Sequence, residues 1–126
     1  MNAARAFLAL GAAAGLLGVA LGAFGAHALR ARFDAQSLAV YHTAVQYQFY
    51  HAAALLAVGL WAALRPTPAV NFAGACFALG ILLFCGSLYA LVLSGARWLG
   101  VVTPIGGVLF LLGWGALLYA AAAFKR

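Results

Sequence analysis

The sequence predicts an all-α integral membrane protein, a compact bundle of four transmembrane helices with short connections. Of its 126 residues, 68% are hydrophobic and 6% are charged, whereas charged residues make up roughly a quarter of an ordinary soluble domain. A helix needs about 20 largely apolar residues to cross the hydrocarbon core of a bilayer. Four runs meet this requirement, so we expect one membrane domain over 1–126 with spans at about 6–28, 41–64, 70–94 and 104–124.

The positions of the charged residues support this prediction. A net charge of +6 would suggest nucleic-acid binding in a soluble protein. Here the seven basic residues lie at or beyond the ends of the apolar runs, as expected where charge at the bilayer centre is unfavourable. We therefore predict membrane lipids as partners, with other membrane proteins or further copies of this chain as additional candidates, and no nucleic acid. An even number of spans places both termini on one side, and four basic residues there against three opposite favour the cytoplasm for the termini.

The first run is interpreted as a retained span. A secretory signal has an apolar stretch of about 7–15 residues, and this run is longer than that. Its glycines recur at spacings of four, three, four and three, and they are Gly11, Gly15, Gly18, Gly22 and Gly25. Small residues mark the contact faces of membrane helices because they let two backbones approach closely. The stripe predicts a packing seam.

The second helix is predicted over about 35–64, with Asp34 as its N-cap and Ser37 as an alternative cap. At about 100° per residue, a polar arc covers one half of its first turns, with Tyr41 and Gln48 near the borders. The arc consists of His42, Thr43, Gln46, Tyr47, Tyr50 and His51. Polar groups at membrane depth must face protein, water or a ligand. The arc therefore predicts an interior surface.

The second half of the chain adds fewer polar groups. Two prolines at 66 and 68 end the second helix. The cysteines, Cys76 and Cys85, are nine residues apart on one helix, so they lie on opposite faces and cannot form a disulfide with each other. Thr103 followed by Pro104 is typical of an N-cap and a first helical residue.

The antiparallel order of the spans places most of the polar side chains in the same half of the membrane. We therefore predict one polar site in that leaflet half, rimmed by basic residues and a tryptophan that suit anionic lipid headgroups. The ligand or interaction candidates are His27, His42, Gln46, Tyr47, Tyr50, His51, Ser87, Tyr89 and Thr103, and the lipid-headgroup candidates are Arg30, Arg32, Arg97 and Trp98.

The chemistry of these residues does not favour an enzyme. The only acidic residue, Asp34, is interpreted as a cap, so no Ser-His-Asp set can be assembled. His27 and His51 lie at different depths, and no cysteine or carboxylate is placed to help bind a metal, so we expect neither haem nor another cofactor. The leading hypothesis is a structural or interaction protein that binds lipid, a small amphiphile or another membrane protein. The alternative is an oligomeric small transporter or channel that uses the histidine-rich second helix.

Five short stretches in order along the chain carry a resemblance to a known family. They are LGAFGAH at 21–27, YQFYH at 47–51, LFCGSLY at 83–89, TPIGG at 103–107 and FLLGW at 110–114. In these stretches the chain resembles the domain of unknown function 423 family of small four-span membrane proteins, found in bacterial inner membranes with animal relatives. The resemblance implies a multi-pass protein of the inner (plasma) membrane. It implies no activity, cofactor or catalytic residue.

Overall fold

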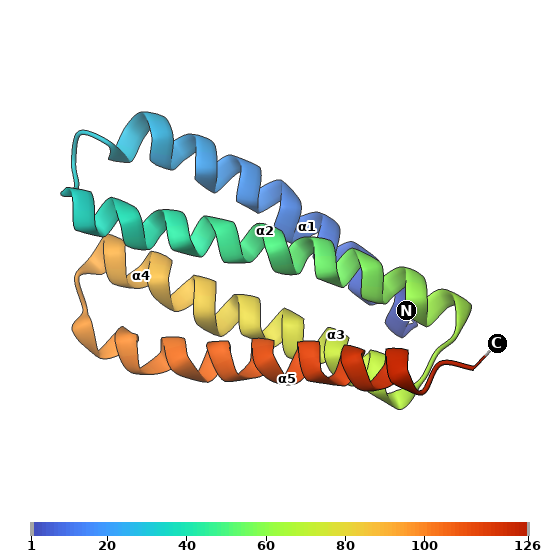
Figure 1. The fold of residues 1–126 in the computed structure, drawn as a ribbon. Helices are drawn as coiled ribbons and strands as arrows, with labels where there is room; N and C mark the ends of the chain where they lie inside the picture. The colour runs from blue at the N-terminus through green and yellow to red at the C-terminus, as the bar shows by residue number, and fades with distance from the viewer. Residues whose placement is uncertain (1, 126) are drawn as a thin grey trace.

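The computed structural model describes residues 2–125, which form four antiparallel helical rods (Figure 1). Each rod is long and apolar enough to cross a membrane, and the four comprise Ala3–Leu29, Ala35–Leu64, Pro68–Ser94 and Arg97–Ala122. The described residues contain no strand. The prediction of an all-α protein with four membrane-spanning helices is confirmed.

Three of the rods change helical type along their length. The first is α1 (Ala3–Phe24) followed by a π-helical turn, η1 (Gly25–Leu29), and the second is α2 (Ala35–Leu64). The third comprises α3 (Pro68–Gly80), a π-helical turn η2 (Ile81–Cys85) and α4 (Gly86–Ser94). The fourth begins as a 3-10 helix, η3 (Arg97–Val101), and continues as α5 (Val102–Ala122). Single π-helical turns within longer helices occur frequently at functional sites.

The helix ends confirm one predicted cap and correct another. Asp34 caps α2, because its Oδ1 accepts a hydrogen bond from the backbone N–H of Ser37 at 2.8 Å. The prediction that Thr103 caps the fourth helix is wrong: the 3-10 helix η3 runs directly into α5, so Thr103 lies inside the first turn. The combination of a threonine cap and a proline at the helix start occurs instead in α3, at Thr67 and Pro68.

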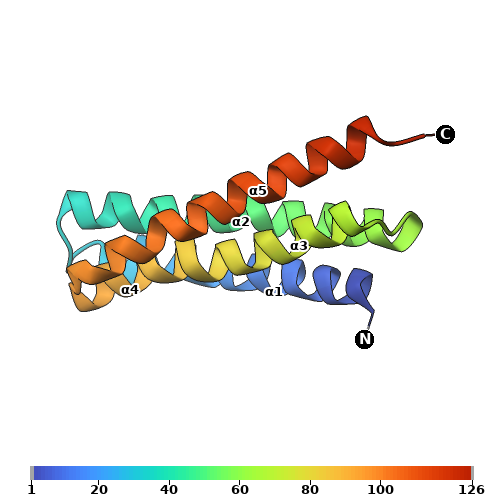
Figure 2. The same ribbon diagram turned by 90° about the horizontal axis from the view of Figure 1, so that it is seen from below.

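The rods pack in chain order, α1 on α2, α2 on the third rod, and the third rod on α5 (Figures 1 and 2). The first and third rods touch at α3, where the ring of Phe7 covers Gly74. Beyond that point they separate, and among the described residues α1 makes no close backbone approach to η2 or α4. The divergence leaves a space between the first and third rods that is bounded on one side by α2.

The predicted glycine seam is narrower than the sequence pattern indicated. A methyl group on Gly11 would lie 3.0 Å from the carbonyl oxygen of Ala52, and one on Gly18 would lie 3.0 Å from the ring of Phe49. Gly25, one further heptad along, is covered by the ring of Tyr41. The intermediate glycines of the stripe have more room, since Gly22 is in ordinary contact and Gly15 meets nothing within 4 Å. Among the glycines of the stripe, the close approaches to α2 therefore follow the seven-residue spacing of Gly11, Gly18 and Gly25.

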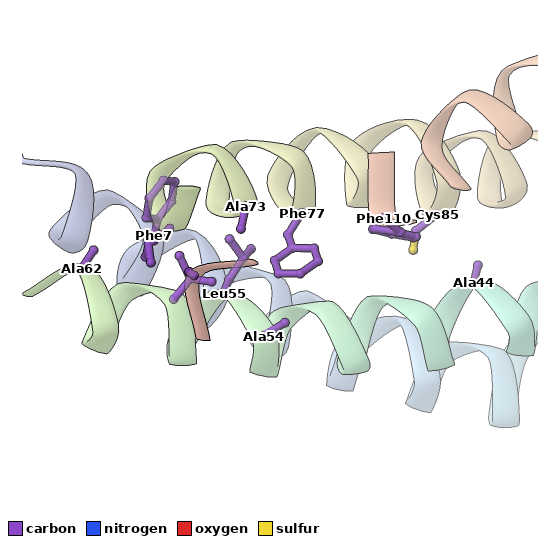
Figure 3. Packing of buried hydrophobic residues seen from close by; sticks show 12 residues of the cluster. Phe7, Ala44, Ala54, Leu55, Ala62, Ala73, Phe77, Cys85 and Phe110 are labelled. Atoms are coloured by element: carbon purple, nitrogen blue, oxygen red, sulfur yellow. The ribbon is translucent and has the colours of Figure 1, made fainter. Parts of the chain in front are cut away.

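The core lies between α2 and the third rod. Figure 3 shows the ring of Phe77 in α3 lying over α2, with Leu55 on one side of it and Phe110 of α5, next to Cys85, on the other. Both cysteines are free and buried. The aromatic rings of this core fill the space between α2 and α5, whose backbones do not pack against each other within residues 2–125.

Candidate functional site

The polar side chains of the interior form hydrogen bonds that connect two or three rods at a time. Gln48 in α2 is 3% exposed and occupies the centre of this arrangement. Its Nε2 donates a hydrogen bond to the carbonyl oxygen of Ala14 in α1 at 2.8 Å, and its Oε1 accepts one from the hydroxyl of Tyr89 in α4 at 2.6 Å. One amide therefore connects three rods. Such bonds between membrane helices contribute about 0.6 kcal/mol each on average.

Tyr41 makes a second link from α2 to the first rod. Its side chain is 1% exposed, and its hydroxyl donates a hydrogen bond to the carbonyl oxygen of Leu21. The Tyr41 ring also lies edge-on to the ring of Tyr89, with the ring centroids 5.3 Å apart. Tyr41 and Gln48 thus bring the same tyrosine of α4 against α2.

A further link joins the third and fourth rods. The hydroxyl oxygens of Ser87 in α4 and Thr103 in α5 are 2.6 Å apart, within hydrogen-bond distance. Ser87 also donates to the carbonyl oxygen of Phe84 at 3.0 Å, so Thr103 is the donor to Ser87. Thr103 thereby has a role between helices in place of the cap predicted for it.

His51 is held by hydrogen bonds at both ring nitrogens. The indole Nε1 of Trp114 lies 3.1 Å from Nε2 of His51, and because an indole nitrogen only donates, Nε2 accepts. The ring proton therefore resides on Nδ1, which donates to the carbonyl oxygen of Tyr47 at 2.7 Å. The imidazole is stacked on Phe110 with a centroid distance of 3.6 Å and an interplanar angle of 10°. His51 is a neutral histidine with its hydrogen-bonding capacity satisfied.

The structure brings only part of the predicted candidate set together. His51, Ser87, Tyr89 and Thr103 participate in bonds between or within the packed rods. Tyr47 is 38% exposed, and its ring stacks on Phe84. The remaining four are exposed on the outside of the bundle, and they are His27, His42, Gln46 and Tyr50. The expectation that Gln46 lies inside with His51 and Tyr89 is corrected, because Gln48 occupies that position.

Gln48 and Tyr41 are the interior polar residues that the sequence interpretation left out. The polar arc indicated which residues are polar but not which face of α2 meets its neighbours. A second pattern does indicate that face: Tyr41, Val45, Gln48, Ala52 and Leu55 follow a spacing of three and four and are all buried. This spacing matches the heptad of the glycine seam on α1.

The predicted headgroup residues lie at the end of the bundle where the first and second rods connect and the third and fourth rods connect. All four are exposed there, and they are Arg30, Arg32, Arg97 and Trp98. Asp34 lies at the same end, where the hydrogen bonds from Ser37 lower the pKa of its carboxyl below the ordinary value. Among residues 2–125, no group of three or more histidine, cysteine or acidic residues is placed to hold a metal ion.

An apolar groove of about 510 Å³ opens between α1 and the third rod. Its walls include Leu17 and Leu21 of the first rod and Leu82 and Gly86 of the third, and α2 forms its floor with Leu55 and Gln48. Its polar lining comes from the side chains of Gln48 and Tyr89, which are hydrogen-bonded to each other. The groove lies where the first and third rods diverge.

Comparison with known proteins places the chain in a family. Residues 21–107 match the family described as protein of unknown function (DUF423). The chain is 43% identical over 121 residues to the UPF0382 membrane protein YwdK of Bacillus subtilis, covering 95% of this chain and 98% of the relative. It is 44% identical over 119 residues to a UPF0382 membrane protein of Haemophilus influenzae, covering 94% and 95%. No solved structure matches it.

A relative from Escherichia coli is named as a protein of the inner membrane. The UPF0382 inner membrane protein YgdD is 40% identical over 122 residues, covering 97% of this chain and 93% of the relative. The family match covers more than half of the chain, and these relatives cover nearly all of it. The chain therefore belongs to the DUF423 family and is a multi-pass membrane protein.

Proposed function

We propose that the protein is a non-catalytic component of the inner membrane that binds the hydrocarbon chain of a membrane lipid in the groove between α1 and the third rod. The observation that carries the proposal is the groove itself, with its volume of about 510 Å³ and its aliphatic walls. The bundle then acts as an interaction protein that holds one lipid chain in a fixed place.

The depth of the groove supports a hydrocarbon chain as the occupant. Leu17 and Leu82 line it from positions near the middle of two rods, each 27 residues long. The middle of a membrane span lies in the hydrocarbon core, where no water is present to fill an apolar recess. An acyl chain packed in the groove replaces missing contacts of its walls with dispersion contacts, which are individually small and collectively large.

The polar links give the groove its shape. Gln48 binds Ala14 on one wall and Tyr89 on the other, so this amide fixes the distance between the walls at the floor. In this proposal the predicted polar site has a structural role, because its side chains are bonded to one another and to backbone carbonyls. The ligand contacts come from the apolar residues above them.

The alternative hypothesis of a histidine-based transporter or channel receives less support. A relay through His51 would have to break its bond from Trp114 or its bond to Tyr47. His27 and His42 are exposed on the outer surface of the bundle, so a proton path through all three histidines would leave the interior. A lipid site requires neither change.

The proposal includes an orientation with both termini in the cytoplasm. Along the sequence, four basic residues (Arg5, Arg65, Lys125 and Arg126) belong to the side that carries the termini, and three (Arg30, Arg32 and Arg97) belong to the opposite side. Basic residues favour the cytoplasmic side. A C-terminal fusion to a reporter that is active only in the cytoplasm tests this orientation, and an inactive fusion would reverse it.

Photocrosslinking tests the lipid site directly. The protein is reconstituted in vesicles that contain a phospholipid with a diazirine at the middle of one acyl chain, irradiated, digested and analysed by mass spectrometry. We expect adducts to concentrate on residues that face the groove. Gly86→Phe should reduce them several-fold, since a side chain at Gly86 enters open space within the groove.

A matched substitution elsewhere controls for added bulk. Gly115 in α5 is exposed, and a methyl group on it would also meet nothing within 4 Å, but it does not line the groove. Gly115→Phe should leave the adduct pattern unchanged. Adducts spread evenly over all lipid-facing helices, or equal effects of the two substitutions, would overturn the proposal.

A further inference from the structure

A second cavity, of about 370 Å³, lies at the end of the bundle where α2 ends, α3 begins and α5 ends. It is lined by residues of the α2–α3 connection and of the segment that follows α5, including Arg65, Thr67 and Lys125. We name it the terminal pocket. It shares no lining residue with the groove, so what it binds is independent of the proposed function.

Arg65 is positioned in the terminal pocket by two contacts with the segment after α5. Its guanidinium donates a hydrogen bond from Nη1 to the carbonyl oxygen of Lys125 and lies 4.7 Å from the ring centroid of Phe124. An arginine side chain carries five N–H donors, and the other donors of Arg65 have no partner among residues 2–125. The guanidinium is therefore held in place while most of its donors stay available.

No acidic side chain lies near the positively charged residues of the terminal pocket. Arg65 and Lys125 both line the cavity. The only acidic residue of the chain, Asp34, precedes the first residue of α2, whereas Arg65 follows its last. A helix of 30 residues separates them, a length of about 45 Å at 1.5 Å per residue. Charges that far apart are screened from each other at physiological salt, so the pocket attracts an external anion.

The aromatic residues place this cavity at the level of the lipid headgroups. Trp61 and Tyr119 line it together with Phe124, and tryptophan and tyrosine are enriched where membrane helices meet the headgroup region. Arginine binds phosphate oxygens with paired N–H donors. Basic pockets between membrane helices bind phosphate-bearing lipid headgroups. We infer that the terminal pocket binds the phosphate of an anionic membrane lipid.

Native mass spectrometry of the full-length protein tests this assignment. The protein is extracted from nanodiscs of phosphatidylglycerol and phosphatidylcholine in equal amounts, and the lipids that stay bound are counted. We expect phosphatidylglycerol to be retained in preference. Arg65→Gln should lower that preference about fivefold, the effect of removing one basic residue near an anionic surface, and Lys125→Gln should lower it less, because its ammonium carries fewer directed donors.

Two further variants separate the pocket from general surface charge and from misfolding. Arg5 lies in the first turn of α1, whose N-terminus is at the same end of the bundle, but it does not line the pocket, so Arg5→Gln should leave the preference within about twofold of the parent protein. Arg65→Lys keeps the charge and should retain most of the preference if the variant folds. Equal losses for Arg5→Gln and Arg65→Gln, or no preference for phosphatidylglycerol in the parent protein, would overturn the inference.

A competition experiment distinguishes a lipid from a soluble phosphate. Inorganic phosphate and glycerol 3-phosphate are added separately at millimolar concentration before analysis. Retention of phosphatidylglycerol in the presence of both supports a headgroup site, because the aromatic and acyl contacts remain with the lipid. Displacement by either soluble anion would show that the pocket binds free phosphate and would overturn the assignment to lipid.

Discussion

The indole N–H of Trp114 donates a hydrogen bond to Nε2 of His51, 3.1 Å away, between two helices whose backbones do not pack against each other. The two side chains thereby connect α2 to α5 across a layer of aromatic rings. Phe110 stacks on the imidazole from the same helix as Trp114. The link fixes the tautomer of His51 and leaves it neutral, so its role is to hold the second and fourth rods together.

Replacing Trp114 should weaken this link. In Trp114→Phe, Nε2 of His51 loses its donor while the aromatic contact is largely kept. We expect the free energy of unfolding to fall by roughly 1 kcal/mol, between the average of about 0.6 and the maximum of about 1.7 kcal/mol measured for hydrogen bonds between membrane helices. Unfolding in mixed detergent micelles, followed by circular dichroism, measures the change. Trp98→Phe is the control, because Trp98 is 68% exposed, and an equal loss in the control would contradict the assignment.

Asp34 predicts a dependence of stability on pH. The hydrogen bonds from Ser37 lower the pKa of this carboxyl in the folded protein below its ordinary value of 3.8. The ionised cap therefore stabilises the fold above that ordinary pKa, and its contribution is lost as the pH falls through the lower folded value. Asp34→Asn keeps a capping oxygen but cannot titrate. We expect stability to decline below about pH 4 in the parent protein, with a smaller decline in Asp34→Asn. Identical acid profiles would contradict this role.

The sequence was sufficient to predict the four spans, because hydropathy averages over about 20 residues and tolerates local errors. It also identified the cap at Asp34, which depends on contacts within one turn. The prediction of a cap at Thr103 was wrong because of tertiary contacts. The hydroxyl of Thr103 is hydrogen-bonded to Ser87 on a neighbouring rod, and the helix begins earlier, as η3. The π-helical turns were not predicted, since the hydropathy pattern carries no signal for a change in backbone bonding.

The interior polar site was predicted in outline only. A helical projection grouped the polar residues of α2 on one half of the helix and predicted an interior surface there, but His42, Gln46 and Tyr50 of that group are exposed. The projection could not show which side of the helix meets α1. In the structure Gln48 is buried and Gln46 is exposed. The two residues are two positions apart, which places them on nearly opposite sides of the helix. The spacing of the buried residues Tyr41, Val45, Gln48, Ala52 and Leu55 identifies the face of α2 that packs on α1. It matches the spacing of the glycines on the facing helix, which mark the contact surface of α1.

The glycines of α5 offer a matched pair of substitutions. A methyl group on Gly106 would meet the backbone of Phe84, which cannot move aside, whereas one on Gly115 meets nothing within 4 Å. We expect Gly106→Ala to lower the free energy of unfolding by about 1–3 kcal/mol through overpacking. Gly115→Ala should be neutral or stabilise by up to about 1 kcal/mol, because alanine favours helix over glycine. Micellar unfolding compares the two, and equal effects would show that the third and fourth rods are packed differently.

Gln48 and Tyr89 provide the sharpest test of the polar interior. Tyr89→Phe removes one hydrogen bond from Gln48, and we expect a loss of roughly 1 kcal/mol in the free energy of unfolding. Gln48→Leu removes that bond and the bond to Ala14, so its loss should be larger. Adding Tyr89→Phe to Gln48→Leu should lower the free energy of unfolding by at most a few tenths of a kcal/mol more. The two residues share one hydrogen bond, which Gln48→Leu has already removed, so their effects are coupled. Gln46→Leu is the control for lost polarity on the same helix.

The outcome with Gln46→Leu separates the two faces of α2. Gln46 is exposed, so its replacement should change stability by less than about 0.5 kcal/mol. If Gln46→Leu is instead the more damaging substitution and Gln48→Leu is neutral, α2 is rotated so that Gln46 faces its neighbours. The floor of the groove would then lose its polar pair, and the lipid site would lose the contact that sets the distance between its walls.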